Sequence, residues 1–147
     1  MSWAAACGLY ITFVGVVPAW GHAVFPTKIF PADSDQRIVV DVPHERAPED
    51  FNVAIDIAIP TGWKAPGCEA VAPWKCRIDA SPHVVRYSKD AAAGPNANDE
   101  KFAFNARTGP PGNHSFPTNQ TYNNGEKVGW IGAAGTAEPA PILKTEA

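Results

Sequence analysis

A histidine that follows an apolar N-terminal segment has the most distinctive chemistry in this sequence. Residues 1–21 contain no Asp, Glu, Lys or Arg, and the run from Trp3 to Val17 is almost entirely apolar. The segment closes with Ala19-Trp20-Gly21, and signal peptidase accepts small residues one and three places before its cut. We therefore expect residues 1–21 to be a signal peptide that is cleaved before His22. The alternative is a single membrane anchor, for which the apolar run is short.

Cleavage at that point would give His22 two metal-binding nitrogens, its freed α-amine and its imidazole Nδ1. Together they can close one chelate ring on a metal ion, which no internal histidine can do. The amine titrates near pH ~8, so a strongly binding cation displaces its proton at neutral pH. Two nitrogens in a square-planar arrangement suit Cu²⁺, which also leads the affinity order of the divalent ions. The sequence therefore predicts copper as the bound metal.

The sulfur-containing residues bear on the oxidation state of that copper. Cys68 and Cys76 are the only cysteines in residues 22–147, and the sole methionine is Met1. In an oxidising compartment the two cysteines would form a disulfide that closes a short loop, worth roughly 2–3 kcal/mol. A soft metal site made of two thiolates is the alternative, but such pairs are more often spaced C-x-x-C. If the cysteines are paired, only nitrogen and oxygen ligands remain, which favours Cu(II) over Cu(I).

The composition indicates the fold that must position these residues. Fifteen prolines and twelve glycines suit short strands joined by turns, and 45% hydrophobic residues suffice for one core. We predict an all-β, immunoglobulin-like or cupredoxin-like sandwich of about seven to nine strands with little helix, formed as one domain by residues 22–147.

Alternating apolar residues locate several strands. Val53, Ile55, Ile57 and Ile59 alternate with smaller or polar residues, and Phe102 and Phe104 do the same. Two further segments rich in Val and Ile are expected to be strands, namely residues 37–42 and 84–88.

Turn-forming residues separate these strands. Asn124-Gly125 predicts a hairpin turn between residues 121–122 and 127–130, because both residue types tolerate positive φ. Turns are also expected at residues 60–62, 66–67 and 109–112. Residues 90–99 should form an exposed loop, and residues 145–147 should be frayed.

A series of short motifs follows one order along residues 22–147. In sequence they are His22 to Pro26, Val42-Pro43-His44-Glu45, Val53 to Pro60 with Gly62, Phe102-Ala103-Phe104, Gln120 to Gly125, Trp130-Ile131-Gly132 and Glu138 to Pro141. Their order and spacing resemble the YcnI-like family of secreted copper-binding domains.

The resemblance implies a mono-histidine brace. Its ligands would be the amine and imidazole of His22 and a carboxylate oxygen of Glu45, and the indole of Trp130 would cover the metal and restrict water. The family's mid-chain tryptophan corresponds to either Trp63 or Trp74. Without the resemblance, Glu45 would be interpreted as a solvated residue at a strand end and Trp130 as a core residue.

The other histidines are not included in the site. His44 neighbours Glu45, and neighbours on a strand point to opposite faces. His83 and His114 lie in Pro-containing stretches and are expected to be exposed polar residues.

These observations predict a periplasmic or extracellular copper(II)-binding protein that acts as a chaperone or carrier. A membrane copper transporter or oxidase would receive the ion.

The net charge of −3 supplies no basic surface for nucleic acid. The sequence has no G-x-S-x-G, phosphate-binding loop or H-E-x-x-H motif, so we expect no enzymatic activity. The alternatives are a metal-free immunoglobulin-like interaction module and a copper-dependent oxidative enzyme.

Overall fold

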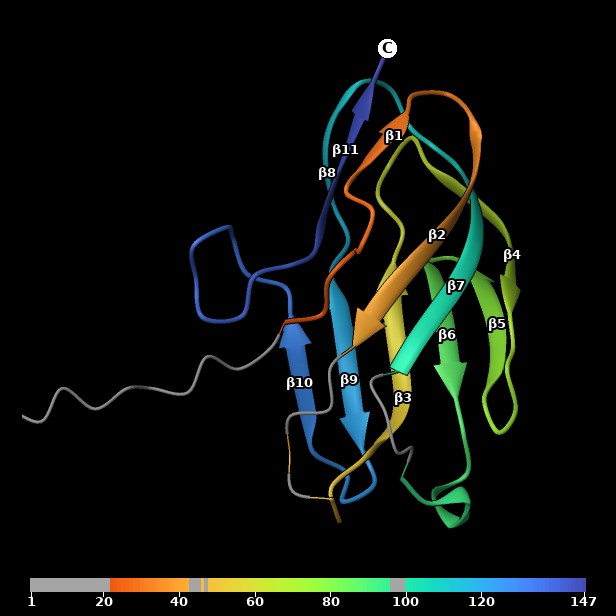
Figure 1. Ribbon diagram of the computed structural model, residues 1–147, viewed down its shortest axis with the longest axis vertical. Coiled ribbons are helices and arrows are strands. Elements are labelled where there is room, and N and C mark those ends of the chain that lie inside the picture. Colours follow the sequence, from red (N-terminus) through yellow and green to blue (C-terminus); the bar gives the residue numbers. More distant parts are fainter. Residues whose placement is uncertain (1–21, 43–45, 47, 96–99) are drawn as a thin grey trace, which may run out of the picture.

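The computed structural model describes residues 22–42, 46, 48–95 and 100–147, which form three β-sheets (Figure 1). The five-stranded sheet has the order β10 (Lys127–Trp130), β9 (Thr118–Tyr122), β3 (Asn52–Ala58), β6 (His83–Ser88) and β5 (Lys75–Ala80). One three-stranded sheet has the order β2 (Asp35–Val42), β7 (Glu100–Arg107) and β4 (Lys64–Glu69). The other has the order β1 (Ile29–Pro31), β11 (Ile142–Glu146) and β8 (Gly112–Ser115).

Helix is scarce, as predicted. The described part of the chain contains one 3-10 turn, η1 (Ala91–Ala93), within the expected loop after β6. No helix in that part has the length and apolarity needed to cross a bilayer. The all-β prediction is therefore confirmed. The eleven described strands exceed the predicted seven to nine because several are only three or four residues long.

The core lies between β2 and β7 on one side and β3 and β6 on the other, and Figure 1 shows the first pair crossing in front of the second. Ile55 and Ile57 are fully buried, as are Ile38 and Val40 on β2. The predicted alternation is therefore confirmed for β3, with one exception. A register shift between Asn52 and Ala54 leaves Val53 only half-buried and turns Asn52 inward.

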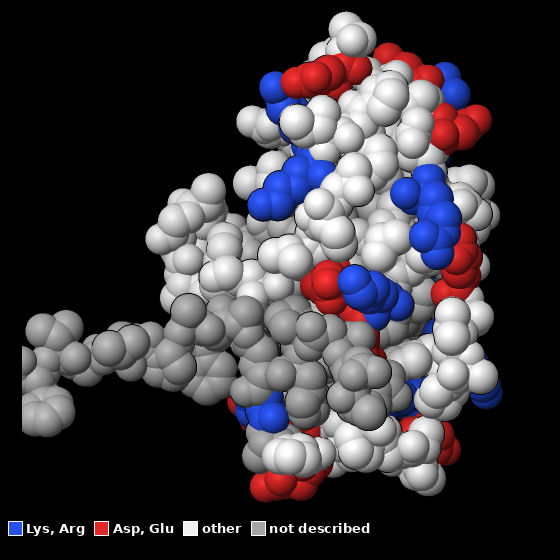
Figure 2. All heavy atoms as spheres, in the orientation of Figure 1, with Lys and Arg blue, Asp and Glu red and all other residues white. Residues whose placement is uncertain are grey.

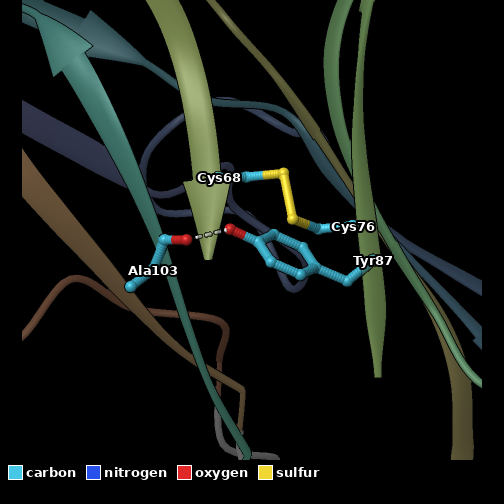
Figure 3. The surroundings of a disulfide bond; sticks show 4 residues. All are labelled: Cys68, Cys76, Tyr87 and Ala103. Carbon is cyan, nitrogen blue, oxygen red and sulfur yellow. Dashed lines mark hydrogen bonds between the residues drawn. A yellow bond between two sulfur atoms is a disulfide. The ribbon is translucent and has the colours of Figure 1, made fainter. Parts of the chain in front are cut away.

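A disulfide between Cys68 and Cys76 joins β4 to β5, the edge strands of two different sheets. The predicted pairing is confirmed, and the alternative of a two-thiolate metal site is wrong. Tyr87 lies beside it and donates a hydrogen bond from its hydroxyl to the carbonyl of Ala103 at 2.5 Å (Figure 3). Burial raises the pKa of Tyr87, so the phenol keeps the proton that it donates.

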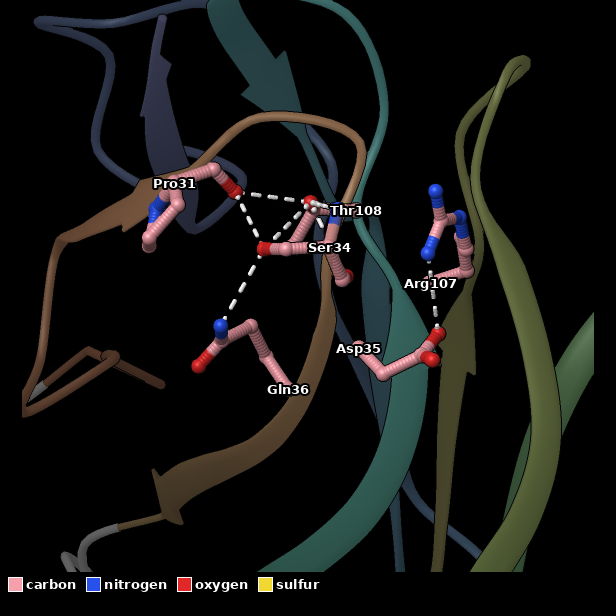
Figure 4. A network of polar contacts seen from close by, with 6 residues as sticks. All are labelled: Pro31, Ser34, Asp35, Gln36, Arg107 and Thr108. Carbon is pink, nitrogen blue, oxygen red and sulfur yellow. Dashed lines mark hydrogen bonds and ion pairs between the residues drawn. The ribbon is translucent and has the colours of Figure 1, made fainter.

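A buried threonine ties the turn between β1 and β2 to the end of β7 (Figure 4). Thr108 is 1% exposed, and its hydroxyl donates to the carbonyl of Pro31 at 2.7 Å. The same hydroxyl accepts from the backbone N–H of Ser34 at 2.9 Å. Asp33, between them, has φ 49°, a conformation that Asp tolerates better than most residues. This network fixes the position of β1 relative to the core.

Two predictions about local structure were wrong. Residues 66–67 do not form a turn but lie inside β4, where an edge position and a register shift between Lys64 and Gly67 accommodate Pro66. The chain end is not frayed, because β11 is the central strand of its sheet and Thr145 is 1% exposed. The hairpin at Asn124-Gly125 is confirmed, with positive φ at Gly125.

Candidate functional site

The segment that carries His22 is fixed to the end of β2. Val24 and Asp41 form an antiparallel bridge, with N–H to carbonyl hydrogen bonds of 2.9 and 2.8 Å. The residues on either side of Val24, Ala23 and Phe25, are each 2% exposed. His22 itself is exposed, so its imidazole is accessible while the backbone next to it is held in place.

The imidazole of His22 lies against the indole of Trp130. The two ring centroids are 5.2 Å apart and the ring planes meet at 78°, an edge-to-face arrangement. Trp130 is 5% exposed and belongs to the hydrophobic core. Trp130 is therefore a core residue and also a direct neighbour of His22, and its role as a cover over a bound metal stays a prediction.

A hydrogen bond fixes the orientation of that indole. Trp130 Nε1 donates to Gln120 Oε1 on the neighbouring strand β9. Gln120 is 2% exposed, and its amide in turn donates to Asn52 Oδ1 at 3.4 Å. The sequence motifs include Gln120 but assign it no role, and Asn52 belongs to none of them. Gln120 shares its strand face with buried Tyr122, but only the pairing of β9 with β10 brings its amide to Trp130.

Glu45, the second predicted ligand, lies outside the described residues, as do His44 and the segment 1–21. The described strand β2 ends at Val42, next to the bridge that fixes Val24. Glu45 follows Val42 by three residues, a length of chain that reaches at most about 11 Å. Within residues 22–42, 46, 48–95 and 100–147, no three His, Cys, Asp or Glu side chains are grouped to hold a metal ion. Of the predicted copper ligands, only His22 is therefore described.

A groove of about 460 Å³ begins at His22. We name it the His22 groove. Its walls are mainly apolar and come from the N-terminal segment, the start of β1 and the approach to β11, with Val24, Ile29, Pro139, Ile142, Lys28 and Lys144 among the lining residues. Its volume is within the range of about 300–1,000 Å³ that is common for ligand pockets.

The face over β2, β7 and β4 carries neighbouring charges of both signs (Figure 2). Arg37 makes two hydrogen bonds of 2.7 Å to Glu69, and this guanidinium lowers the pKa of that carboxyl. Lys101 lies 3.4 Å from Asp41. This face therefore presents ion pairs rather than a patch of one sign.

A buried ion pair lies elsewhere in the core. Lys89 and Glu100 are 8% and 4% exposed, and Lys89 Nζ is 4.0 Å from Glu100 Oε1. Lys89 Nζ also donates to the carbonyl of Gly94 at 3.0 Å and lies over the Trp74 ring. Burial raises the pKa of Glu100 to about 7, although the charge of Lys89 counteracts this effect. Neither residue was singled out from the sequence, because Glu100 follows a polar stretch that predicts a loop.

The other histidines and tryptophans that the structure describes lie within the β-sandwich, away from His22. The expectation that His114 is exposed was wrong: it lies half-buried in β8, with Nε2 2.8 Å from the carbonyl of Pro110 and 3.0 Å from Thr145 Oγ1. The same expectation was wrong for His83, which is half-buried at the start of β6. Trp63 and Trp74, the two candidates for the family's mid-chain tryptophan, are both buried in the core.

Comparison with solved structures places this sandwich in a known fold class. An uncharacterised protein from Nocardia farcinica with an immunoglobulin-like fold matches with a TM-score of 0.64 and 22% identity, covering 86% of this chain and 97% of that one. The fold is immunoglobulin-like. A cohesin in a cohesin–dockerin complex from Clostridium thermocellum matches with a TM-score of 0.53 and 9% identity, covering 85% of this chain and 98% of that one. A non-cellulosomal cohesin from Archaeoglobus fulgidus has the same TM-score and identity, with 86% and 91% covered.

These similarities concern the fold alone, because all three identities are low. No family model matches the chain, and no curated protein matches it.

Proposed function

We propose that the chain, once cleaved before His22, binds Cu(II) as cargo in the periplasm or outside the cell and carries it to a membrane copper transporter or oxidase. The contact between His22 and Trp130, with centroids 5.2 Å apart, is the observation on which this proposal depends. The resemblance to YcnI-like domains implies the same two residues in one site, although they lie far apart in the sequence.

Three residues of the chain would form the copper site. The α-amine and the imidazole of His22 would chelate the ion, and the carboxylate of Glu45 would add an oxygen ligand and offset one positive charge. The buried indole of Trp130, held by Gln120, would shield one side of the imidazole from water. The exposure of His22 supports exchange of the ion with a partner without unfolding of the core.

The decisive experiment compares residues 22–147 with the same chain acetylated at the α-amine of His22. Acetylation converts this amine into an amide, so the chain no longer has a free terminal amine beside the imidazole, and every side chain is unchanged. We expect Cu(II) affinity, measured by competition with a chromogenic chelator, to fall by more than the roughly 10- to 100-fold lost when outer partners of a metal site are removed. Equal affinities in the two chains would refute the brace.

Two variants test the side chains. Glu45→Gln should weaken Cu(II) binding, whereas Glu49→Gln, an exposed control a few residues further on, should not. Trp130→Phe should leave the amine and imidazole in place but change the electron paramagnetic resonance spectrum of the bound Cu(II). An unchanged affinity in Glu45→Gln would exclude that carboxylate as a ligand.

The second candidate function is a metal-free interaction module. It is supported by the fold similarity to cohesins, one of which was solved bound to a dockerin, and by the exposed apolar His22 groove. The same titration separates the candidates, because absence of Cu(II) binding by residues 22–147 would leave only the module. Turnover of a reductant by the copper-loaded chain with peroxide would instead favour an oxidative enzyme.

A further inference from the structure

Exposed apolar side chains gather beside His22. Val24, Ile29 and Ile142 are 41%, 54% and 43% exposed, and all three line the His22 groove. Isolated exposed apolar residues are ordinary on a protein surface, but three in one groove form a contiguous surface suited to a binding partner.

The charges of the groove are of one sign. Among the residues that the structure describes, Lys28 and Lys144 are the only charged ones that line it. Lys144 Nζ is 2.6 Å from Glu146 Oε1, and both side chains are half exposed. Such an exposed ion pair is weak, so Lys144 can pair with a carboxylate of a partner instead. Lys28 makes no ion pair or side-chain hydrogen bond with any residue that the structure describes. The groove therefore presents a free cation in a chain whose net charge is −3.

The two lysines decide which kind of partner fits this groove: a second copy of the chain, a membrane surface or a segment of another protein. A two-fold contact with a second copy would bring the lysines of both copies into one interface, where they would repel each other. An anionic membrane is recruited by clusters of about four to eight basic residues, and this groove has two. An apolar protein segment flanked by carboxylates matches both the apolar walls and the two lysines.

We propose that the His22 groove docks an extended apolar segment of a partner protein whose flanking carboxylates meet Lys28 and Lys144. The docked partner would lie next to His22, where copper would be handed over. The role of this docking in copper transfer rests on the proposed function, but the docking itself requires no metal.

The test uses metal-free, ¹⁵N-labelled chain 22–147 and a synthetic peptide of four alternating Val and Leu residues with two Asp residues at each end. A matched peptide carries Lys in place of each Asp. We expect the acidic peptide to shift the amide resonances of Val24, Ile29 and Ile142, and the basic peptide to leave them unchanged. Binding of the acidic peptide should weaken as salt is raised.

Two pairs of variants give the controls. Lys28→Glu should weaken binding of the acidic peptide roughly five- to tenfold, whereas Lys127→Glu, an exposed lysine on β10, should not. Ile142→Ser should also weaken it, whereas Val71→Ser should not, although Val71 is 70% exposed on another part of the surface.

Equal binding of the two peptides, or of Lys28→Glu and the parent chain, would overturn the proposal, as would the absence of binding. Concentration-dependent dimerisation that Ile142→Ser abolishes would assign the groove to a second copy instead. Because the titration contains no copper, a failed copper measurement would leave this result standing, and a failed peptide titration would leave the copper proposal standing.

Discussion

The buried carboxyl of Glu100 should make the stability of this fold depend on pH in an unusual direction. Its pKa is raised from an ordinary value of 4.5 to about 7, so the folded chain holds this proton more tightly than the unfolded chain. Stability then falls as the pH rises from 4.5 to about 7, because in this range the unfolded chain releases the proton that the folded chain still holds. At about 1.4 kcal/mol for each pH unit, this gap corresponds to about 3 kcal/mol.

Glu100→Gln tests this expectation, because glutamine imitates the protonated side chain and does not titrate. At pH 4 the variant and the parent chain should have similar free energies of unfolding. By pH 8 the variant should be more stable than the parent by up to about 3 kcal/mol. Glu138→Gln, an exposed control, should follow the parent at every pH.

The assay is urea unfolding of residues 22–147 followed by fluorescence at intervals from pH 4 to pH 8. Lys89→Met provides a second readout, because removing the nearby positive charge should raise the pKa of Glu100 further. Curves for Glu100→Gln and the parent that stay parallel across this range would refute the reasoning. So would a carboxyl resonance of Glu100 that titrates at or below pH 4.5.

Two further changes test the contacts that hold the sandwich together. Replacing both Cys68 and Cys76 with Ser should lower the free energy of unfolding by about 2–3 kcal/mol, since the disulfide closes a loop with a sequence separation of 8; urea unfolding measures this, and an unchanged midpoint would contradict it. Thr108→Val should cost about 1–3 kcal/mol because the carbonyl of Pro31 loses a buried donor. Thr136→Val, which removes an exposed hydroxyl, should cost less than Thr108→Val in the same assay.

The local sequence predicted the structure correctly where the residues of one segment determine its conformation. The alternation at Ile55 and Ile57 and at Phe102 and Phe104 predicted β3 and β7, because a half-buried strand must place apolar residues at every second position. Asn124-Gly125 predicted its hairpin, because Gly125 adopts a positive φ that few other residues tolerate.

The same reasoning failed where a distant partner decides the outcome. Thr145 was expected to be frayed because it lies near the end of the sequence. Instead it belongs to β11, which is hydrogen-bonded to a strand on each side. Pro66 predicts a turn, but β4 accommodates it as an edge strand with a register shift. In both cases the backbone's hydrogen-bond partners lie far away in the sequence, so the local residue types carry no information about them.

For the candidate site too, some features follow from the sequence and others only from the tertiary structure. The sequence by itself determined that His22 follows an uncharged apolar segment and that Cys68 and Cys76 are the only cysteines after it. Only the tertiary structure placed the imidazole of His22 against Trp130 and bonded that indole to Gln120. The physical reason is that residue types fix the available chemistry, whereas strand pairing decides which of these groups come within contact distance.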